Sequence, residues 1–150
     1  MRILSATILT LFTLVCLSSI SYANEIYPEQ ELLNLINSHR QQIESLPPLY
    51  QDWEAARVAR YKAEDMLQQN YFGHHSPVYG SFFDMLDNFN ILYLSAGENI
   101  AANFPSPQSV MEAWLSCPEH RKNILSRNFT RAGVGYVPEG NYWVLILIEY

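Results

Sequence analysis

The sequence predicts an α+β domain in which helices cover both faces of a small, mainly antiparallel sheet. Two strand-like segments, 132–137 and 142–148, are joined by a turn that contains Pro138 and Gly140, so they are expected to form a hairpin. Part of the second segment, 144–148, is apolar throughout instead of alternating, which is typical of a strand covered on both faces. Segments with helical spacing precede the hairpin and provide that cover.

The predicted helices follow one another along the chain. Pro28 and the acidic residues after it begin the first helix, which Pro47 and Pro48 end. Further helices are predicted over 51–69 and 81–88, from Ser106 and Pro107 onward, and over 119–125. Positions of the first two helices expected to face the core are Leu32, Leu33, Ile36, Ile43, Trp53, Ala56, Ala59, Ala63, Met66 and Leu67.

Two segments between these helices do not have a helical pattern. The first, 70–80, contains Gly73, Pro77 and Gly80 and is predicted to be a loop. The second, 91–94, is predicted to be extended and leads into 97–101. Since binding residues are often carried on loops, the first of these segments is a candidate for function.

The first 23 residues have the order of a cleavable export signal. Arg2 precedes an apolar run over 8–17, and Ser21 and Ala23 have the spacing that signal peptidase accepts. We therefore expect cleavage after Ala23, export to the periplasm or the medium, and no stable membrane anchor in the mature protein. Residues 24–150 have the usual length of a single domain.

Charge and cysteine content limit the partners and the means of stabilisation. The formal net charge is −6 at pH 7, so nucleic acid and anionic lipid surfaces are not expected as partners. Signal cleavage would remove Cys16 and leave Cys117 as the remaining cysteine, so no intramolecular disulfide is expected. We expect a monomer that is stabilised by its core.

Three polar segments place an ionisable residue among small or rigid neighbours. They are Tyr71-Phe72-Gly73-His74-His75-Ser76-Pro77, Gly97-Glu98-Asn99-Ile100-Ala101, and 114–125 with His120 before Arg121-Lys122-Asn123-Ile124-Leu125. In order and spacing they resemble the bacterial branch of the CAP superfamily, which is also called SCP-like. Two more segments resemble that branch: Asn37-Ser38-His39-Arg40 with Leu46-Pro47-Pro48-Leu49, and 129–136, Phe-Thr-Arg-Ala-Gly-Val-Gly-Tyr.

The resemblance extends over nearly all of residues 24–150 and implies a three-layer α-β-α sandwich. It also implies a ligand cavity lined by two histidines and one or two acids; the histidines match His74 and His120 and one acid matches Glu98, with Asn99 beside them. His75 is not the matching histidine. Relatives in animals and fungi have a second glutamate after a tryptophan, but Trp114 is followed here by Leu-Ser-Cys-Pro.

Several functions fit this set of residues. His74, His120 and Glu98 could bind a divalent metal such as zinc, since two imidazoles and a carboxylate leave one coordination position open. With Glu98 as general base, the same set could act as a metal-dependent, protease-like hydrolase. We favour a non-catalytic binding module for a metal, a lipid or a peptide-like ligand. A further alternative is a buried hydrogen-bond network that only stabilises the fold.

Cys117 lies directly before Pro118 and three residues before His120. If Pro118 is the first residue of a helix, Cys117 is its cap, and the helix dipole would favour a reactive thiolate. The alternative is that Cys117 is a small buried side chain without reactivity. Ser76 is not predicted to be a nucleophile, because Ser-Pro is typical of turns.

Overall fold

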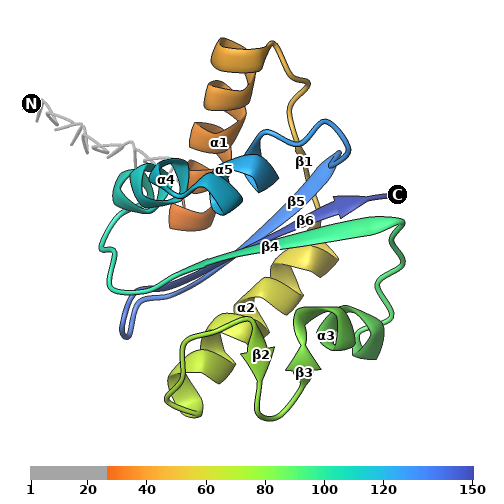
Figure 1. Cartoon of the computed structure of the whole chain (residues 1–150). Helices are drawn as coiled ribbons and strands as arrows, with labels where there is room; N and C mark the ends of the chain where they lie inside the picture. The colour runs from red at the N-terminus through yellow and green to blue at the C-terminus, as the bar shows by residue number, and fades with distance from the viewer. Residues whose placement is uncertain (1–26) are drawn as a thin grey trace, which may run out of the picture.

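A four-stranded sheet lies between two layers of helices in the computed structural model, which describes residues 27–150 (Figure 1). The strands pair in the order β1 (Tyr50–Gln51), β5 (Arg131–Val137), β6 (Tyr142–Glu149) and β4 (Ser95–Ala101). β6 is antiparallel to both of its neighbours, β5 and β4, whereas β1 is parallel to β5. The predicted sandwich with a mainly antiparallel sheet is confirmed. The predicted export signal, 1–23, lies outside the described residues.

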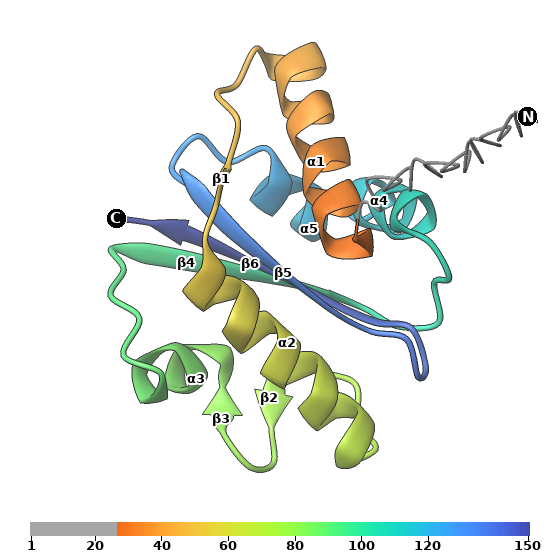
Figure 2. The same cartoon turned by 180° about the vertical axis from the view of Figure 1, so that it is seen from behind.

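The helices divide between the two faces of the sheet (Figures 1 and 2). On one face lie α1 (Pro28–Glu44), α4 (Pro107–Ser116) and α5 (Pro118–Ile124), and on the other lie α2 (Trp53–Gln68) and α3 (Phe82–Asn88). Between α2 and α3, the short strands β2 (His75–Ser76) and β3 (Gly80–Ser81) form a separate antiparallel pair.

Each face of the sheet has its own core. Leu145 and Leu147 of β6 pack in the core with α1, α4 and α5, whereas Val144 and Ile146 pack in the core with α2 and α3. Since neighbouring residues of a strand point to opposite faces, this arrangement explains why β6 is apolar throughout. The predicted double-sided burial of this strand is confirmed.

The segment that follows α1 is fixed by two polar side chains. The amide of Asn37 donates to the carbonyl of Leu49 at 3.0 Å and accepts from its N–H at 2.8 Å. The fully buried guanidinium of Arg40 donates to the carbonyls of Pro47, Ile124 (2.7 Å) and Ser126. The bonds of Arg40 join α1 to the end of α5. Together with those of Asn37, they explain why an asparagine and an arginine occupy these two positions of α1.

Two glycines of β5 allow α2 to lie directly against the sheet. A Cβ at Gly133 would lie 2.0 Å from the backbone nitrogen of Ala56, and one at Gly135 would lie 2.3 Å from the carbonyl carbon of Ala59. A side chain at either position would therefore push the helix away. The two glycines therefore set the short distance between α2 and the sheet.

Some local predictions were wrong. Gln51 belongs to β1, and Asp52 caps α2 through a 2.9 Å bond from the Ala55 N–H. Trp53, Ile43 and Leu67 are exposed instead of buried, because they lie in terminal turns of their helices. The β2–β3 pair within the predicted loop was not foreseen. The segment 91–94, predicted to be extended, contains no helix and leads into β4. None of the described helices has the length and apolar character needed to cross a membrane.

Candidate functional site

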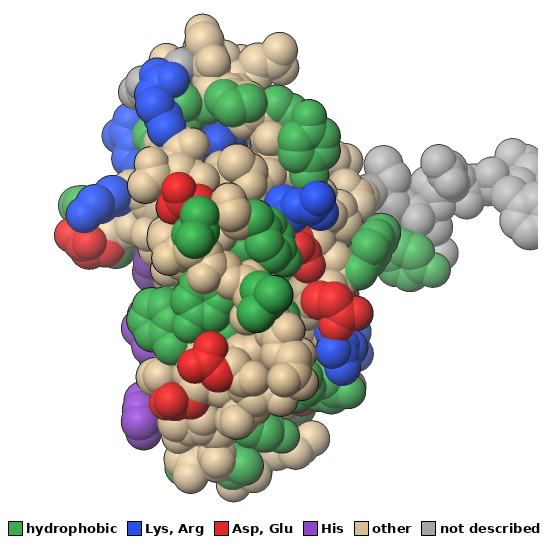
Figure 3. All heavy atoms as spheres, turned by 90° about the vertical axis from the view of Figure 1, so that its right-hand side faces the viewer, with side chains coloured by type: hydrophobic (Ala, Val, Ile, Leu, Met, Phe, Trp, Pro, Cys, Tyr) green, Lys and Arg blue, Asp and Glu red, His purple; other side chains and the backbone are tan. Residues whose placement is uncertain are grey.

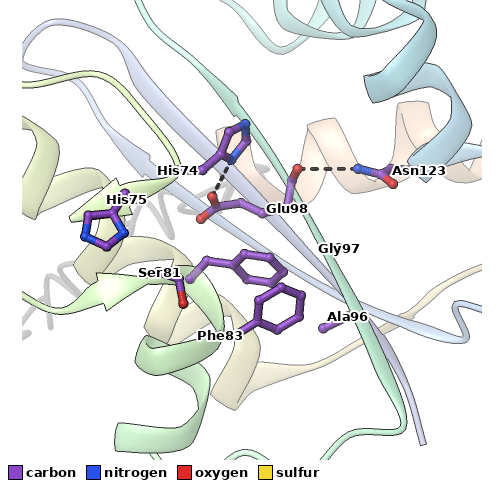
Figure 4. A pocket seen from close by; sticks show the side chains of 9 residues that line it. His74, His75, Ser81, Phe83, Ala96, Gly97, Glu98 and Asn123 are labelled. Carbon is purple, nitrogen blue, oxygen red and sulfur yellow. Dashed lines mark hydrogen bonds and ion pairs between the residues drawn. The ribbon is translucent and has the colours of Figure 1, made fainter.

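A pocket of about 470 Å³ opens beside β4, between α3, the β2–β3 pair and α5 (Figure 4). The β4 strand contributes one wall, the two phenylalanines at the start of α3 contribute another, and α5 contributes an amide. The lining residues are His74, His75, Ser81, Phe82, Phe83, Ala96, Gly97, Glu98 and Asn123.

The structure brings His74 and Glu98 together at this pocket. Nδ1 of His74 lies 2.7 Å from Oε1 of Glu98. The Glu98 side chain is 1% exposed and the His74 side chain 56% exposed, so a buried carboxylate holds a ring that faces solvent. The second carboxylate oxygen, Oε2, is buried and has no hydrogen-bond partner among the described residues.

A lysine that the sequence analysis did not identify lies behind this pair. Lys62 of α2 is fully buried, and burial lowers the pKa of its ammonium group, while the charges of Glu98 and Asp65 act in the opposite direction. Its Nζ lies 3.0 Å from the hydroxyl of Tyr71. Lys62 is therefore a buried amine close enough to two carboxylates for their charges to act on it.

The loop that carries His74 is attached to α2 through Asp65. This carboxylate accepts hydrogen bonds from the hydroxyls of Tyr71 and Ser76, the latter at 2.7 Å. Burial and the bond to Asp65 raise the pKa of Tyr71. The Ser76 hydroxyl also accepts the N–H groups of Val78 and Tyr79, as expected for a turn. Ser76 is thus a buried structural residue of this loop.

Asn99 of β4 and His120 of α5 do not line the pocket. The fully buried amide of Asn99 donates to the backbone carbonyl of His120 at 3.1 Å and accepts from Asn123 at 2.9 Å. Asn123 also contacts the carbonyl of Glu98 at 3.4 Å. These amides hold α5 against the outer edge of β4 and place Asn123 at the mouth of the pocket.

The imidazole of His120 has a different environment from that of His74. It is half-buried and makes an edge contact with the Trp114 ring, at 6.4 Å between centroids. Burial, with a smaller contribution from His74, lowers the pKa of His120. His120 is therefore favoured in its neutral form.

The three residues considered as zinc ligands do not form a ready site. Within residues 27–150, no group of three or more His, Cys, Asp or Glu side chains is arranged to hold a metal ion. Nδ1 of His74 is used by Glu98, so its Nε2 is the atom left for an ion. Metal binding by His74, Glu98 and His120 would require His120 to approach the other two, and it stays a prediction.

Cys117 separates α4 from α5. It is half-buried and free, and its side chain makes no capping hydrogen bond to α5. Its reactivity stays a prediction, which a thiol reagent would test by comparing the labelling rate of the folded protein with that of a model peptide.

Some site residues could have been found from the sequence. Lys62 lies three residues after Ala59 and four before Met66, on the apolar face of α2, and a charged residue on such a face indicates a buried partner. Phe82 and Phe83 had no comparable signal, because their position at the pocket depends on how α3 packs.

The chain is similar to known proteins over most of its length. The profile of CAP, the cysteine-rich secretory protein family, matches residues 33–149. The chain belongs to the CAP family. A Bacillus subtilis (strain 168) protein described as uncharacterized, YkwD, is 48% identical over 115 residues, which are 77% of this chain and 44% of YkwD.

Solved structures of other proteins have the same fold. An extracellular protein containing an SCP domain from Bacillus anthracis superposes with a TM-score of 0.78 and 34% identity, over 82% of this chain and 40% of that one. An outer surface protein of Borrelia burgdorferi has a TM-score of 0.73 at 17% identity, over 80% and 90% of the two chains, and so shares the fold. This CAP domain spans less than half the length of either Bacillus protein.

Proposed function

We propose that this CAP domain is an exported, non-catalytic binding module whose pocket beside His74 and Glu98 binds a small, partly apolar ligand of lipid or peptide-like chemistry. The location is supported by the export-signal pattern of residues 1–23 and by the similar Bacillus anthracis and Borrelia burgdorferi proteins, which are described as extracellular and outer-surface proteins.

The observation that carries the binding role is the composition of the pocket wall. The rings of Phe82 and Phe83 lie 4.0 Å apart between centroids, and Phe83 is 44% exposed. Opposite them are the polar groups of His74 and Asn123. An apolar wall with a few fixed polar groups, in a volume of about 470 Å³, is typical of sites for small ligands.

The surroundings of the pocket are also apolar. Figure 3 shows the side of the molecule that lies on the right in Figure 1, with hydrophobic side chains gathered in its middle, acidic side chains among them and histidines at one edge. Leu92 and Leu94, in the connection between α3 and β4, are 81% and 77% exposed. Such a surface can extend the contact made by a ligand that is longer than the pocket.

The hydroxyls near the pocket are engaged in structural bonds, which favours binding over nucleophilic catalysis. Ser81 donates its hydroxyl to Asp84 at 2.7 Å within the capping box of α3. Ser76 is buried and donates to Asp65. Glu98 accepts from His74, and its other oxygen is buried. A nucleophile next to a free base, which covalent catalysis requires, is not found at the pocket among the described residues.

Metal-dependent hydrolysis with Glu98 as general base is the alternative for the same residues. Its support is the solvent-facing Nε2 of His74. Metal analysis of the purified protein, followed by peptide hydrolysis with and without chelator, tests it. Stoichiometric zinc with chelator-sensitive hydrolysis would replace the binding proposal by the enzymatic one.

The binding proposal is tested by chemical-shift mapping of the ¹⁵N-labelled protein. Dodecanoate serves as the lipid-like probe, and a library of acetylated and amidated pentapeptides serves as the peptide-like probe. We expect at least one probe to shift the amide resonances of Phe83, Gly97 and Asn123 more than those of Gln41, which is exposed on α1. If neither probe changes the resonances of the pocket, the proposal is wrong.

A further inference from the structure

The outer edge of β4 is covered over only part of its length. β4 ends the order β1-β5-β6-β4, so its side away from β6 has no neighbouring strand among the described residues. The carbonyl of Ile100 accepts from the Trp114 indole at 3.1 Å, and the carbonyl of Glu98 accepts from Asn123 at 3.4 Å. Side chains of α4 and α5 thus protect the C-terminal half of this edge, which is a common way to prevent unwanted pairing.

The N-terminal half of the same edge faces the pocket. In an antiparallel ladder, a residue directs both its N–H and its C=O to one side, and the side alternates along the strand. Since Glu98 and Ile100 direct their carbonyls outward, Ala96 also directs its two backbone groups outward. Ala96 is half-buried and lines the pocket, as Figure 4 shows.

Outward backbone groups spaced along an extended strand match another extended backbone. This is the mode in which peptides add to an exposed sheet edge, with main-chain bonds for affinity and side-chain pockets for specificity. A lipid tail could contact Phe82 and Phe83 but would leave the N–H and C=O of Ala96 without partners. An extended peptide can contact the two phenylalanine rings with a side chain and also form hydrogen bonds with the N–H and C=O of Ala96.

The pocket also limits the side chains of such a peptide. Neighbouring residues of a strand point to opposite sides, so one side chain can lie on Phe82 and Phe83 while the next points away. The chain carries a net charge of −6, and Glu98 adds a carboxylate at the pocket wall, so an acidic peptide is disfavoured.

We propose that the pocket binds a short extended peptide that adds as a strand to the outer edge of β4 beside Ala96, with an apolar central residue and neutral or basic neighbours. This inference rests on the proposed binding function and specifies its ligand class.

The test selects binders from the pentapeptide library and then methylates the backbone nitrogen of the best binder at each position in turn. We expect an alternating pattern. Methylation of the residue that pairs with Ala96 weakens binding at least about tenfold, because it removes a hydrogen bond and prevents close approach, and methylation of the next residue has little effect. Amide hydrogen exchange at Ala96 and Glu98 is expected to slow in the complex.

A matched pair of variants tests the same contact from the side of the protein. Ala96→Pro removes an outward N–H but no bond to β6, and proline is tolerated on edge strands. It is expected to weaken peptide binding at least about tenfold, whereas Ile43→Ser, at an exposed position of α1 outside the pocket, leaves it unchanged. If Ala96→Pro does not fold, the methylation pattern on the unmodified protein decides alone.

The outcomes separate this inference from the function on which it rests. Dodecanoate binding in the pocket without any peptide binder overturns the peptide inference and leaves the binding function standing. Absence of both kinds of binding overturns both. Peptide binding without an alternating methylation pattern, or dimers that form through the β4 edges of two copies, overturns strand addition.

Discussion

Nδ1 of His74 lies 2.7 Å from Oε1 of Glu98, and this contact joins the loop before β2 to the edge strand of the sheet. Because a carboxylate only accepts hydrogen bonds, Nδ1 carries the ring proton and Nε2 faces the solvent. The pair therefore fixes both the position and the tautomer of the exposed imidazole.

Removal of the Glu98 carboxylate is expected to destabilise the fold. In Glu98→Ala, His74 loses its acceptor and the buried Lys62 loses one of two nearby negative charges. We expect the free energy of unfolding in urea to fall by about 1–3 kcal/mol. Glu119→Ala, at an exposed position of α5, is the control and should unfold like the parent protein. Equal stability of the two variants would contradict the role assigned to Glu98. A loss of stability without any loss of ligand binding would favour a purely structural network.

Arg40 is expected to be needed as an arginine. Its guanidinium reaches three carbonyls at once, which a lysine cannot do. Arg40→Lys should lower the free energy of unfolding by about 2 kcal/mol or more, because buried carbonyls lose their donors. Arg127→Lys, at an exposed position, should have no measurable effect in the same denaturation experiment. Similar midpoints for the two variants would show that the buried contacts of Arg40 contribute little.

The close approach of α2 to β5 predicts opposite results for two glycine substitutions. Gly135→Ala places a methyl group 2.3 Å from the helix backbone and should destabilise the protein by about 3 kcal/mol or more. Gly73→Ala meets no atom within 4 Å and should be tolerated. Thermal unfolding followed by circular dichroism compares the two. A Gly135→Ala variant as stable as Gly73→Ala would mean that α2 lies farther from the sheet than described.

His120 is expected to make stability depend on pH. Its pKa in the folded protein lies below the ordinary 6.5, so the unfolded chain binds more protons in weakly acidic solution. Stability should therefore decrease as the pH falls from about 6.5 through the lowered pKa, and His120→Gln should reduce this dependence. His75→Gln, at an exposed position, should not reduce it. Urea denaturation between pH 7 and pH 5 measures the free energy of unfolding of the parent protein and the two variants. An equal change with pH in all three would contradict the role assigned to His120.

Local patterns predicted the layers of this fold well. The continuous apolar run of β6 indicated a sheet buried on both faces, and Pro28, Pro107 and Pro118 marked the starts of three helices. The exposure of residues such as Trp53 was harder to predict, because helical spacing cannot show which turns of a helix extend beyond the sheet. The parallel pairing of β1 with β5 joins residues that lie far apart in the sequence, and no local pattern encodes it.

The site was only partly predictable for a similar reason. The motifs around His74 and Glu98 identified two residues that are in contact, although 24 positions separate them. Motif order could not show that the Asn99 side chain bonds to α5 instead of lining the pocket beside Glu98, since neighbouring residues of a strand point to opposite faces. The aromatic wall of Phe82 and Phe83 is a consequence of tertiary packing.

The most direct test of the central claim compares two phenylalanine variants for binding of the best probe found by shift mapping. Phe83 lines the pocket, whereas Phe72 is 56% exposed but lies outside it. Isothermal titration should show an affinity for Phe83→Ala that is reduced at least about tenfold, and an affinity for Phe72→Ala equal to that of the parent protein. Unchanged binding in Phe83→Ala, or equal losses in both variants, would contradict the claim that this pocket is the binding site.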